Sequence, residues 1–205
     1  MGARRHDEKA PLARCLVIAC GALARELLAV KEANGWSHLD VTCLPAILHN
    51  RPQEIPAAVR RKIRRARGRY DEILCLYGDC GTGGLLDQVL AEEGVERIDG
   101  PHCYSFYAGT ADFDALMEEE VGTFFLTDYL VRHFDRLVWR GLGLDRHPEL
   151  LPDYFRHYRR VVYLVQMPSD ALRAKAEDAA RRLGLALELR TTGLGGIDRF
   201  LAAHA

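Results

Sequence analysis

The chain has 205 residues, which is enough to bury a sizeable core in one domain or in two small lobes. Its 28 basic and 29 acidic side chains nearly cancel, and 48% of its residues are hydrophobic, as in an ordinary soluble globular protein. This balance excludes a strongly basic surface for nucleic acid, and no stretch approaches the roughly 18 to 20 apolar residues that a membrane-spanning helix needs. We therefore expect a cytoplasmic protein with no nucleic-acid partner and no membrane partner.

Strand and helix patterns alternate along the first half of the chain. Short apolar runs bounded by glycine or proline predict strands over 14–21, 39–49, 71–81 and, more weakly, 95–103. Apolar residues at helical spacing predict helices over 22–35, 55–70 and 84–94. This alternation indicates an α/β protein with a mostly parallel, Rossmann-like sheet flanked by helices.

A long aromatic segment interrupts the alternation. Residues 112–144 have helical spacing with a break at Gly122, and we interpret them as the start of an all-helical insertion at about 112–158. A loop at 141–150 holds polar side chains that could contact a substrate: Asp145, Arg146 and His147. Strand and helix patterns then return over 160–166, 169–184, 185–191 and 196–204. We expect one α/β domain over 12–205, preceded by a flexible tail of residues 1–11 that lacks the apolar core of a signal peptide.

The six cysteines divide into two groups on this map. Three lie inside apolar strand patterns and are expected to fill the core as small hydrophobic side chains: Cys15, Cys43 and Cys75. Three others stand where a predicted strand ends, next to glycine or proline: Cys20, Cys80 and Cys103. The second predicted strand ends at His49 instead. Because the carboxyl ends of parallel strands meet at one edge of a sheet, we expect these four side chains to converge.

Three thiolates and one imidazole are ligands that zinc accepts in a tetrahedral site. The sequence therefore predicts that Cys20, His49, Cys80 and Cys103 bind a zinc ion, with His102 as a substitute for His49. A cubane iron–sulfur cluster (4Fe–4S) held by the three cysteines, with one iron left open, is the competing interpretation. Because no local Cys-x-x-Cys pair is present, the alternative without a metal is that the cysteines are structural residues at tight turns.

The stretch GDCGTGG, residues 78–84, suggests two further roles. Backbone N–H groups at a helix start lower the pKa of a thiol, so Cys80 is a candidate catalytic nucleophile of a metal-free hydrolase or transferase, with His49 as its base. The same turn resembles an anion-binding loop, in which Gly81, Thr82 and Gly83 would bind the phosphate of a cofactor, although it lacks the lysine and the spacing of a P-loop. A tight turn that needs glycine is the simpler alternative.

Four motifs carry a resemblance to a known family: LYGDCGTGG, GPHCY, GTFFLTDYLVRHFD and GLGLDRHPEL. With these motifs the chain resembles, from Cys15 onward, the DUF1638 family of bacterial and archaeal proteins. The resemblance implies a setting beside corrinoid-dependent methyltransferases that act on methylated amines, and hence a role in one-carbon metabolism. In that setting we expect a metal-binding protein acting in or beside corrinoid-linked methyl metabolism. The alternative is a non-enzymatic accessory protein that contacts a corrinoid, or binds a corrinoid protein or a methyltransferase.

Overall fold

Four parallel strands form the first sheet of the computed structural model, which describes residues 13–204. Their order is β2 (Leu39–Leu44), β1 (Cys15–Cys20), β3 (Glu72–Leu76) and β4 (Glu96–Arg97). β1 pairs with β2 on one side and with β3 on the other, so every residue of β1 is buried. The parallel sheet and its alternating strands and helices confirm the fold class that the sequence predicts.

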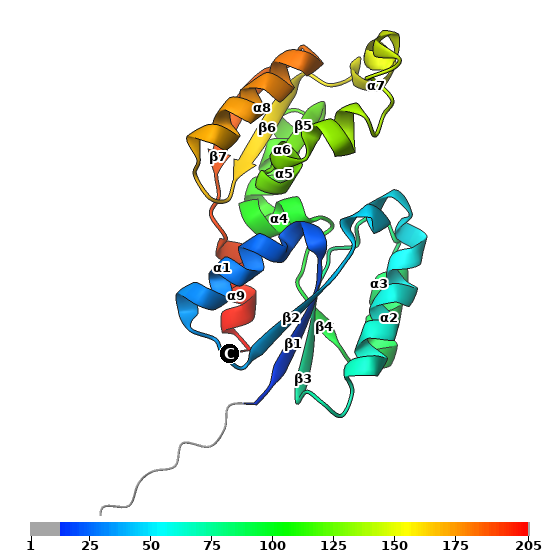
Figure 1. Ribbon diagram of the computed structural model, residues 1–205, viewed down its shortest axis with the longest axis vertical. Coiled ribbons are helices and arrows are strands. Elements are labelled where there is room, and N and C mark those ends of the chain that lie inside the picture. The colour runs from blue at the N-terminus through cyan, green and yellow to red at the C-terminus, as the bar shows by residue number, and fades with distance from the viewer. Residues whose placement is uncertain (1–12, 205) are drawn as a thin grey trace, which may run out of the picture.

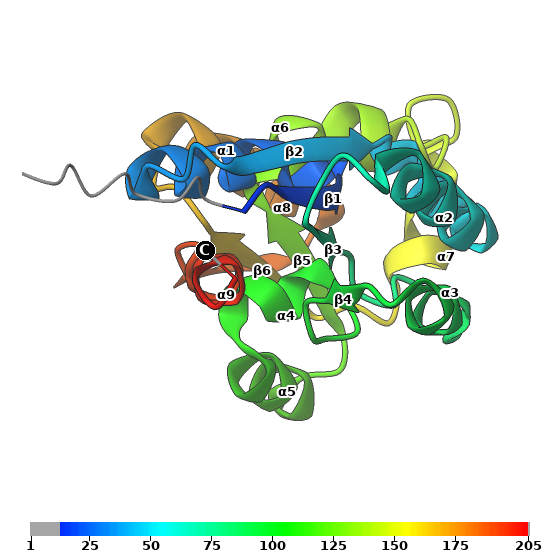
Figure 2. The ribbon, with the colours of Figure 1, turned by 90° about the horizontal axis from the view of Figure 1, so that it is seen from below.

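Helices cover both faces of this sheet. α2 (Ile55–Ala66) and α3 (Leu85–Glu93) lie side by side on one face, and α1 (Ala24–Asn34) shares the other with α9 (Gly195–Ala202) (Figure 2). Short 3-10 turns precede α1 and α2: η1 (Gly21–Leu23), η2 (Ala46–Asn50) and η3 (Pro52–Glu54). α1 ends at Gly35, whose φ of 65° is the left-handed conformation that glycine adopts without steric cost, as its closing position in the sequence predicts.

A second parallel sheet contains β5 (Thr123–Thr127), β6 (Arg160–Val165) and β7 (Ala186–Thr191), in that order. α5 (Thr110–Glu119) precedes β5, α6 (Asp128–Arg132) follows it, and α8 (Asp170–Leu183) joins β6 to β7. The connection between α6 and β6 contains a π-helical turn η4 (Asp135–Trp139), a 3-10 turn η5 (Pro148–Leu150) and α7 (Leu151–Phe155).

The all-helical insertion expected at about 112–158 is wrong at its centre, because residues 123–127 form β5. The aromatic side chains there alternate in direction. Phe124 packs on Phe155 with ring centroids 5.4 Å apart, whereas Phe125 packs on Phe113 at 5.2 Å. A short apolar run fits a buried strand as well as a helix, and pairing with β6 decides for the strand. The chain after residue 160 therefore joins β5 in a sheet of its own.

The buried side chains form separate clusters around the two sheets. We call residues 13–108 and 195–204 the first lobe, and residues 110–193 the second lobe. α4 (Cys103–Ala108) lies between the two sheets (Figure 1). Its Tyr107 is buried in the core of the first lobe, and its Tyr104 stacks on Phe125 of the second lobe with centroids 5.4 Å apart.

The chain returns to the first lobe through α9, which packs directly against the backbone of α4. A Cβ atom on Gly196 would lie 1.8 Å from the carbonyl oxygen of Phe106, so only glycine fits at this contact. β1 and β6 run toward each other, and the carboxyl ends of both sheets therefore face the region of α4 (Figure 1). None of the helices within residues 13–204 is long and apolar enough to cross a membrane.

Candidate functional site

Cys20 is the last residue of β1 and lies at the carboxyl edge of the first sheet, as predicted. It is 4% exposed, and its Sγ accepts a hydrogen bond from the backbone N–H of Ala22 at 3.3 Å, which caps η1. Burial raises the pKa of the Cys20 thiol to about 12. The thiol is therefore protonated at neutral pH.

His49 follows β2 and lies beside Cys20. Its Nδ1 is 3.8 Å from the Sγ of Cys20 and 3.1 Å from the carbonyl oxygen of Ala46. Because a carbonyl only accepts, Nδ1 donates its proton there, and the neutral ring carries its lone pair on Nε2. The ring stacks on Tyr77, and its partial burial lowers the pKa of His49. His49 could thus bind a metal ion only through Nε2, the nitrogen that does not contact Cys20.

Cys80 lies in the loop beyond the end of β3 at Leu76, and not at the strand end itself as predicted. Its φ is 50°, and it is the only non-glycine residue among residues 13–204 with a positive φ. Burial raises the pKa of its half-buried thiol to about 11. No histidine within the described chain forms a hydrogen bond with Cys80, so this conformation does not supply the base that a nucleophile needs.

The glycine-rich turn after Cys80 closes around Asp79. The Asp79 carboxylate accepts hydrogen bonds from the Thr82 hydroxyl at 2.6 Å and from the N–H groups of Gly84 at 2.8 Å and Gly83 at 3.2 Å. These bonds hold the pKa of Asp79 below its usual range. The loop expected to bind a phosphate through Gly81, Thr82 and Gly83 is therefore already filled by a carboxylate of the chain itself.

Cys103 begins α4, whereas the sequence predicts it at the end of a strand. The difference arises because β4 is only two residues long and a loop follows it. That loop packs on the Cys80 loop so closely that a Cβ atom on Gly78 would lie 2.9 Å from the carbonyl oxygen of Pro101. Cys103 is half-buried, and burial raises the pKa of its thiol.

The three thiols come from different segments, the end of β1, the loop after β3 and the start of α4, and all three belong to or pack against the same hydrophobic core. A negative charge on Cys80 raises the pKa of both Cys20 and Cys103, and a charge on Cys20 raises that of Cys103. Cys20 belongs to the hydrophobic core of the first lobe, Cys80 and Cys103 pack against that core, and His49 lies beside Cys20. As they stand, however, no three histidine, cysteine, aspartate or glutamate side chains in residues 13–204 are placed to hold a metal ion.

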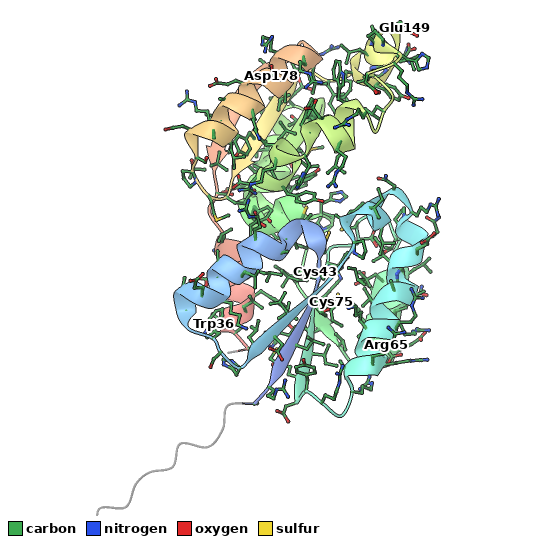
Figure 3. All side chains as sticks on the ribbon, viewed as in Figure 1. Trp36, Cys43, Arg65, Cys75, Glu149 and Asp178 are labelled. Carbon is green, nitrogen blue, oxygen red and sulfur yellow. The ribbon has the colours of Figure 1, made fainter. Side chains whose placement is uncertain are left out.

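The other candidate residues occupy different elements of the fold. Cys15, Cys43 and Cys75 are within β1, β2 and β3, and Figure 3 labels two of them inside the first sheet. Figure 3 also places Glu149 at the far end of the second lobe. The substrate loop expected at 141–150 is therefore remote from the first sheet, and the Nδ1 of its His147 lies 3.2 Å from Oε1 of the exposed Glu149.

A buried polar group on α1 is missed by the sequence analysis. Glu26 on α1 is 1% exposed, and neither of its carboxylate oxygens has a hydrogen-bond partner among residues 13–204. Its Oε1 is 3.7 Å from Nη1 of Arg132 on α6. The apolar residues Leu23, Leu27 and Val30 lie on the same face of α1 as Glu26. This helical spacing is the pattern that could have identified Glu26 as buried.

Asp128, at the start of α6, is also fully buried, but its carboxylate has several hydrogen-bond donors. It accepts hydrogen bonds from the Tyr163 hydroxyl at 2.7 Å and from the N–H groups of Met167 at 3.1 Å and Gln166 at 3.2 Å. Asp128 therefore joins the carboxyl ends of β5 and β6, and its role is structural.

The fold and these side chains define a parallel α/β protein with two sheets and a thiol cluster at the edge of the first. A protein-family model described as a protein of unknown function, DUF1638, matches residues 43–201, and the chain belongs to this family. The match confirms the resemblance of the sequence motifs. It includes His49, Cys80 and Cys103, whereas Cys20 and Glu26 precede it. A comparison with the curated proteins finds no match.

Proposed function

We propose that the protein binds an iron–sulfur cluster through Cys20, Cys80 and Cys103 at the carboxyl edge of the first sheet. The observation that carries this proposal is that three segments far apart in the sequence place three thiols in, or packed against, one hydrophobic core. Thiolates are the ligands of iron–sulfur clusters and of many zinc sites. Burial keeps these thiols protonated, so binding a cation would release their protons.

We favour a cluster over a single zinc ion because a cluster needs only the three cysteines, whereas a closed zinc site needs four ligands; no group of three or more such ligands in residues 13–204 is placed to hold one ion. In a cube of iron and sulfide, each cysteine binds an iron atom of its own, so the ligand sulfurs are farther apart than around one ion. Three cysteines also leave one iron without a thiolate. That iron is left open for His49, through its Nε2, or for a substrate.

The alternative of a metal-free cysteine nucleophile has less support. The pKa of Cys80 is raised to about 11, whereas a nucleophilic cysteine has a lowered pKa. Its base in that mechanism, His49, contacts Cys20 instead. The amide groups that would lower a thiol pKa in this turn bind Asp79.

The family setting implied by the motifs is compatible with a cluster. Beside corrinoid-dependent methyltransferases, a cluster protein could bind a cofactor or a partner protein that carries a corrinoid. A non-enzymatic accessory protein that binds a corrinoid protein or a methyltransferase is the second candidate. An exposed apolar patch on residues 112–144 would favour it, but Val121 is the only large hydrophobic residue exposed in that segment.

Protein purified without oxygen tests the proposal through its iron, sulfide and zinc content and its UV–visible spectrum. After reconstitution with ferrous iron and sulfide, we expect a brown protein with about four irons per chain. A colourless protein with about one zinc per chain would show that the thiols bind a single zinc ion instead of a cluster. A folded protein that takes up neither metal would overturn a metal site at these thiols.

A further inference from the structure

β7 forms an open edge of the second sheet. Within residues 13–204 it pairs only with β6, and four of its six residues are exposed. Leu189 in this strand is 38% exposed, and no other large hydrophobic residue of a described strand is exposed. An edge strand presents unpaired backbone N–H and C=O groups, to which a further strand can bind. β7 is therefore a candidate interaction surface.

The pairing with β6 fixes which residues of β7 direct their backbone groups outward. The N–H of Thr192, directly after the strand, donates a hydrogen bond to the carbonyl oxygen of Val165 in β6 at 3.0 Å. Because successive N–H groups of a strand point in opposite directions, those of Thr191, Leu189 and Leu187 point away from β6, and their carbonyl groups do the same. These three residues thus offer donors and acceptors to another strand.

The sequence of β7 is complementary to itself in the antiparallel direction. With a two-fold axis through Leu189, each outward-facing residue meets another one: Leu189 lies opposite Leu189 of a second copy, and Leu187 opposite Thr191. Glu188 then lies opposite Arg190 of the second copy, and opposite charges at such positions stabilise a sheet. An axis through Leu187 or Thr191 would lose both charge pairs and shorten the paired stretch.

The two faces of the sheet leave room for an added strand at this edge. Glu188 lies on the face that α5 covers, because Arg160 donates hydrogen bonds both to Glu188 and to the carbonyl oxygen of Leu116 in α5. α5 does not cover the end of β7: a cavity of about 400 Å³ lies between them and is lined by Leu116 and Arg190, among others. On the opposite face, Leu187 packs on the core, whereas Leu189 remains exposed.

We propose that the protein forms a homodimer in which two β7 strands pair in the antiparallel direction about Leu189, so that the second sheets of both copies become one continuous sheet. Glu188 and Arg190 already contact each other at 3.2 Å within one chain, and the pairing extends this contact into a row of alternating charges. Leu189 is buried against its own copy, which removes its apolar surface from water. This inference does not depend on the proposed cluster.

Size-exclusion chromatography with light scattering, in the presence of a reductant, tests the dimer. We expect wild type at twice the chain mass of 23.1 kDa and Leu189→Lys at the chain mass, because two lysines would face each other at the axis. Leu28→Lys is the matched control, since Leu28 is 54% exposed on α1, and it should remain dimeric. A monomeric wild type, or a dimeric Leu189→Lys, would overturn the proposal.

A second variant keeps the test valid if circular dichroism shows that Leu189→Lys does not fold. Arg190→Glu changes an exposed side chain and places two acidic groups opposite each other across the axis. We expect it to weaken the dimer, whereas Arg190→Lys keeps the charge and should stay dimeric. Equal dimer affinities of Arg190→Glu and Arg190→Lys would overturn the pairing of Glu188 with Arg190.

Disulfide cross-linking tests the register. In the proposed dimer the two Cα atoms of residue 189 lie about 5.5 Å apart, within reach of a disulfide, whereas those of residue 191 lie roughly 14 Å apart. After exposure to oxidised glutathione, Leu189→Cys should form a covalent dimer, and Thr191→Cys and wild type should not. Because Thr191 is also exposed and shares its face of β7 with Leu189, equal cross-linking of the two variants would overturn the register.

Discussion

The backbone N–H of Cys80 donates a hydrogen bond to the carbonyl oxygen of Pro101 at 3.0 Å. This bond joins the loop that carries Cys80 to the loop that precedes Cys103. Neither loop is a helix or a strand, and their mutual packing requires glycine at position 78. Two of the three converging thiols are therefore positioned by contacts between loops, while Cys20 alone is positioned by the sheet.

Replacing Cys80 tests whether the thiol cluster binds a metal. We expect Cys80→Ala to lose stoichiometric iron after reconstitution, because two thiols cannot retain the cluster that three hold. Cys43→Ala is the matched control, since Cys43 is also a partly buried free thiol but lies within β2. Metal analysis of both proteins is the measurement. Unchanged iron in Cys80→Ala would remove Cys80 from the site.

The backbone of Cys80 gives a second prediction, which does not depend on metal. A left-handed conformation costs a non-glycine residue roughly 1 kcal/mol, and Cys80 has a φ of 50°. We expect metal-free Cys80→Gly to be about 1 kcal/mol more stable than Cys80→Ala, because both lose the thiol and only alanine keeps the strain. Urea denaturation measures the difference. Equal stabilities would show that this loop adapts its backbone without cost.

The contact between α9 and α4 predicts a strong effect at Gly196. A methyl group there would meet the carbonyl oxygen of Phe106, so Gly196→Ala should reduce the free energy of unfolding by about 1 to 3 kcal/mol. The neighbouring Gly195→Ala is the control. Its methyl group would meet only the flexible end of Arg199, at 3.2 Å, and should change the stability little. Equal effects of the two substitutions would contradict the close packing of α9.

The buried carboxylate of Glu26 predicts a pH dependence of the metal-free protein. Burial raises the pKa of Glu26 above 4.5, so the folded protein holds this proton more tightly than the unfolded chain does. Wild type should therefore lose stability relative to Glu26→Gln as the pH rises from 4.5 through the folded-state pKa. Urea denaturation of both proteins at several pH values measures the difference. A difference that does not grow with pH would contradict the raised pKa of the buried Glu26 carboxyl group.

The single-domain prediction is tested by the cooperativity of unfolding. The first lobe contains segments from before and after the second lobe, and α4 contacts both cores. We therefore expect both lobes to unfold in one transition. The two tryptophans report on them separately, because Trp36 packs on the first core and Trp139 on the second. Different urea midpoints for the Trp36→Phe and Trp139→Phe proteins would contradict the prediction.

The sequence predicts the first half of the fold well because strong local features agree there. Apolar strand runs alternate with helical spacing, and glycines such as Gly35 and Gly94 close the helices in the left-handed conformation. The second half is less well predicted, because the aromatic run in β5 fits two periodicities and only its pairing with β6 selects the strand.

The sequence predicts only part of how the candidate site residues are placed, and their role as metal ligands stays a prediction. Cys20 lies at a strand end as expected, but Cys80 and Cys103 approach each other through loops whose packing has no local sequence pattern. The lack of a hydrogen-bond donor for the Glu26 carboxylate is a property of the folded interior. Its burial can be read from the helical spacing, whereas the absence of a donor depends on where Arg132 and Asp128 lie in the other lobe.

The return of α9 to the first lobe has a consequence for biosynthesis. Ile197 and Leu201 complete the apolar core that also holds Tyr107 of α4, yet they are translated only after the whole second lobe. During translation the thiol-bearing lobe therefore remains without one of its covering helices until both sheets have left the ribosome. Any centre that these cysteines hold would be completed only after the second lobe has been translated, so the topology sets the timing of its insertion.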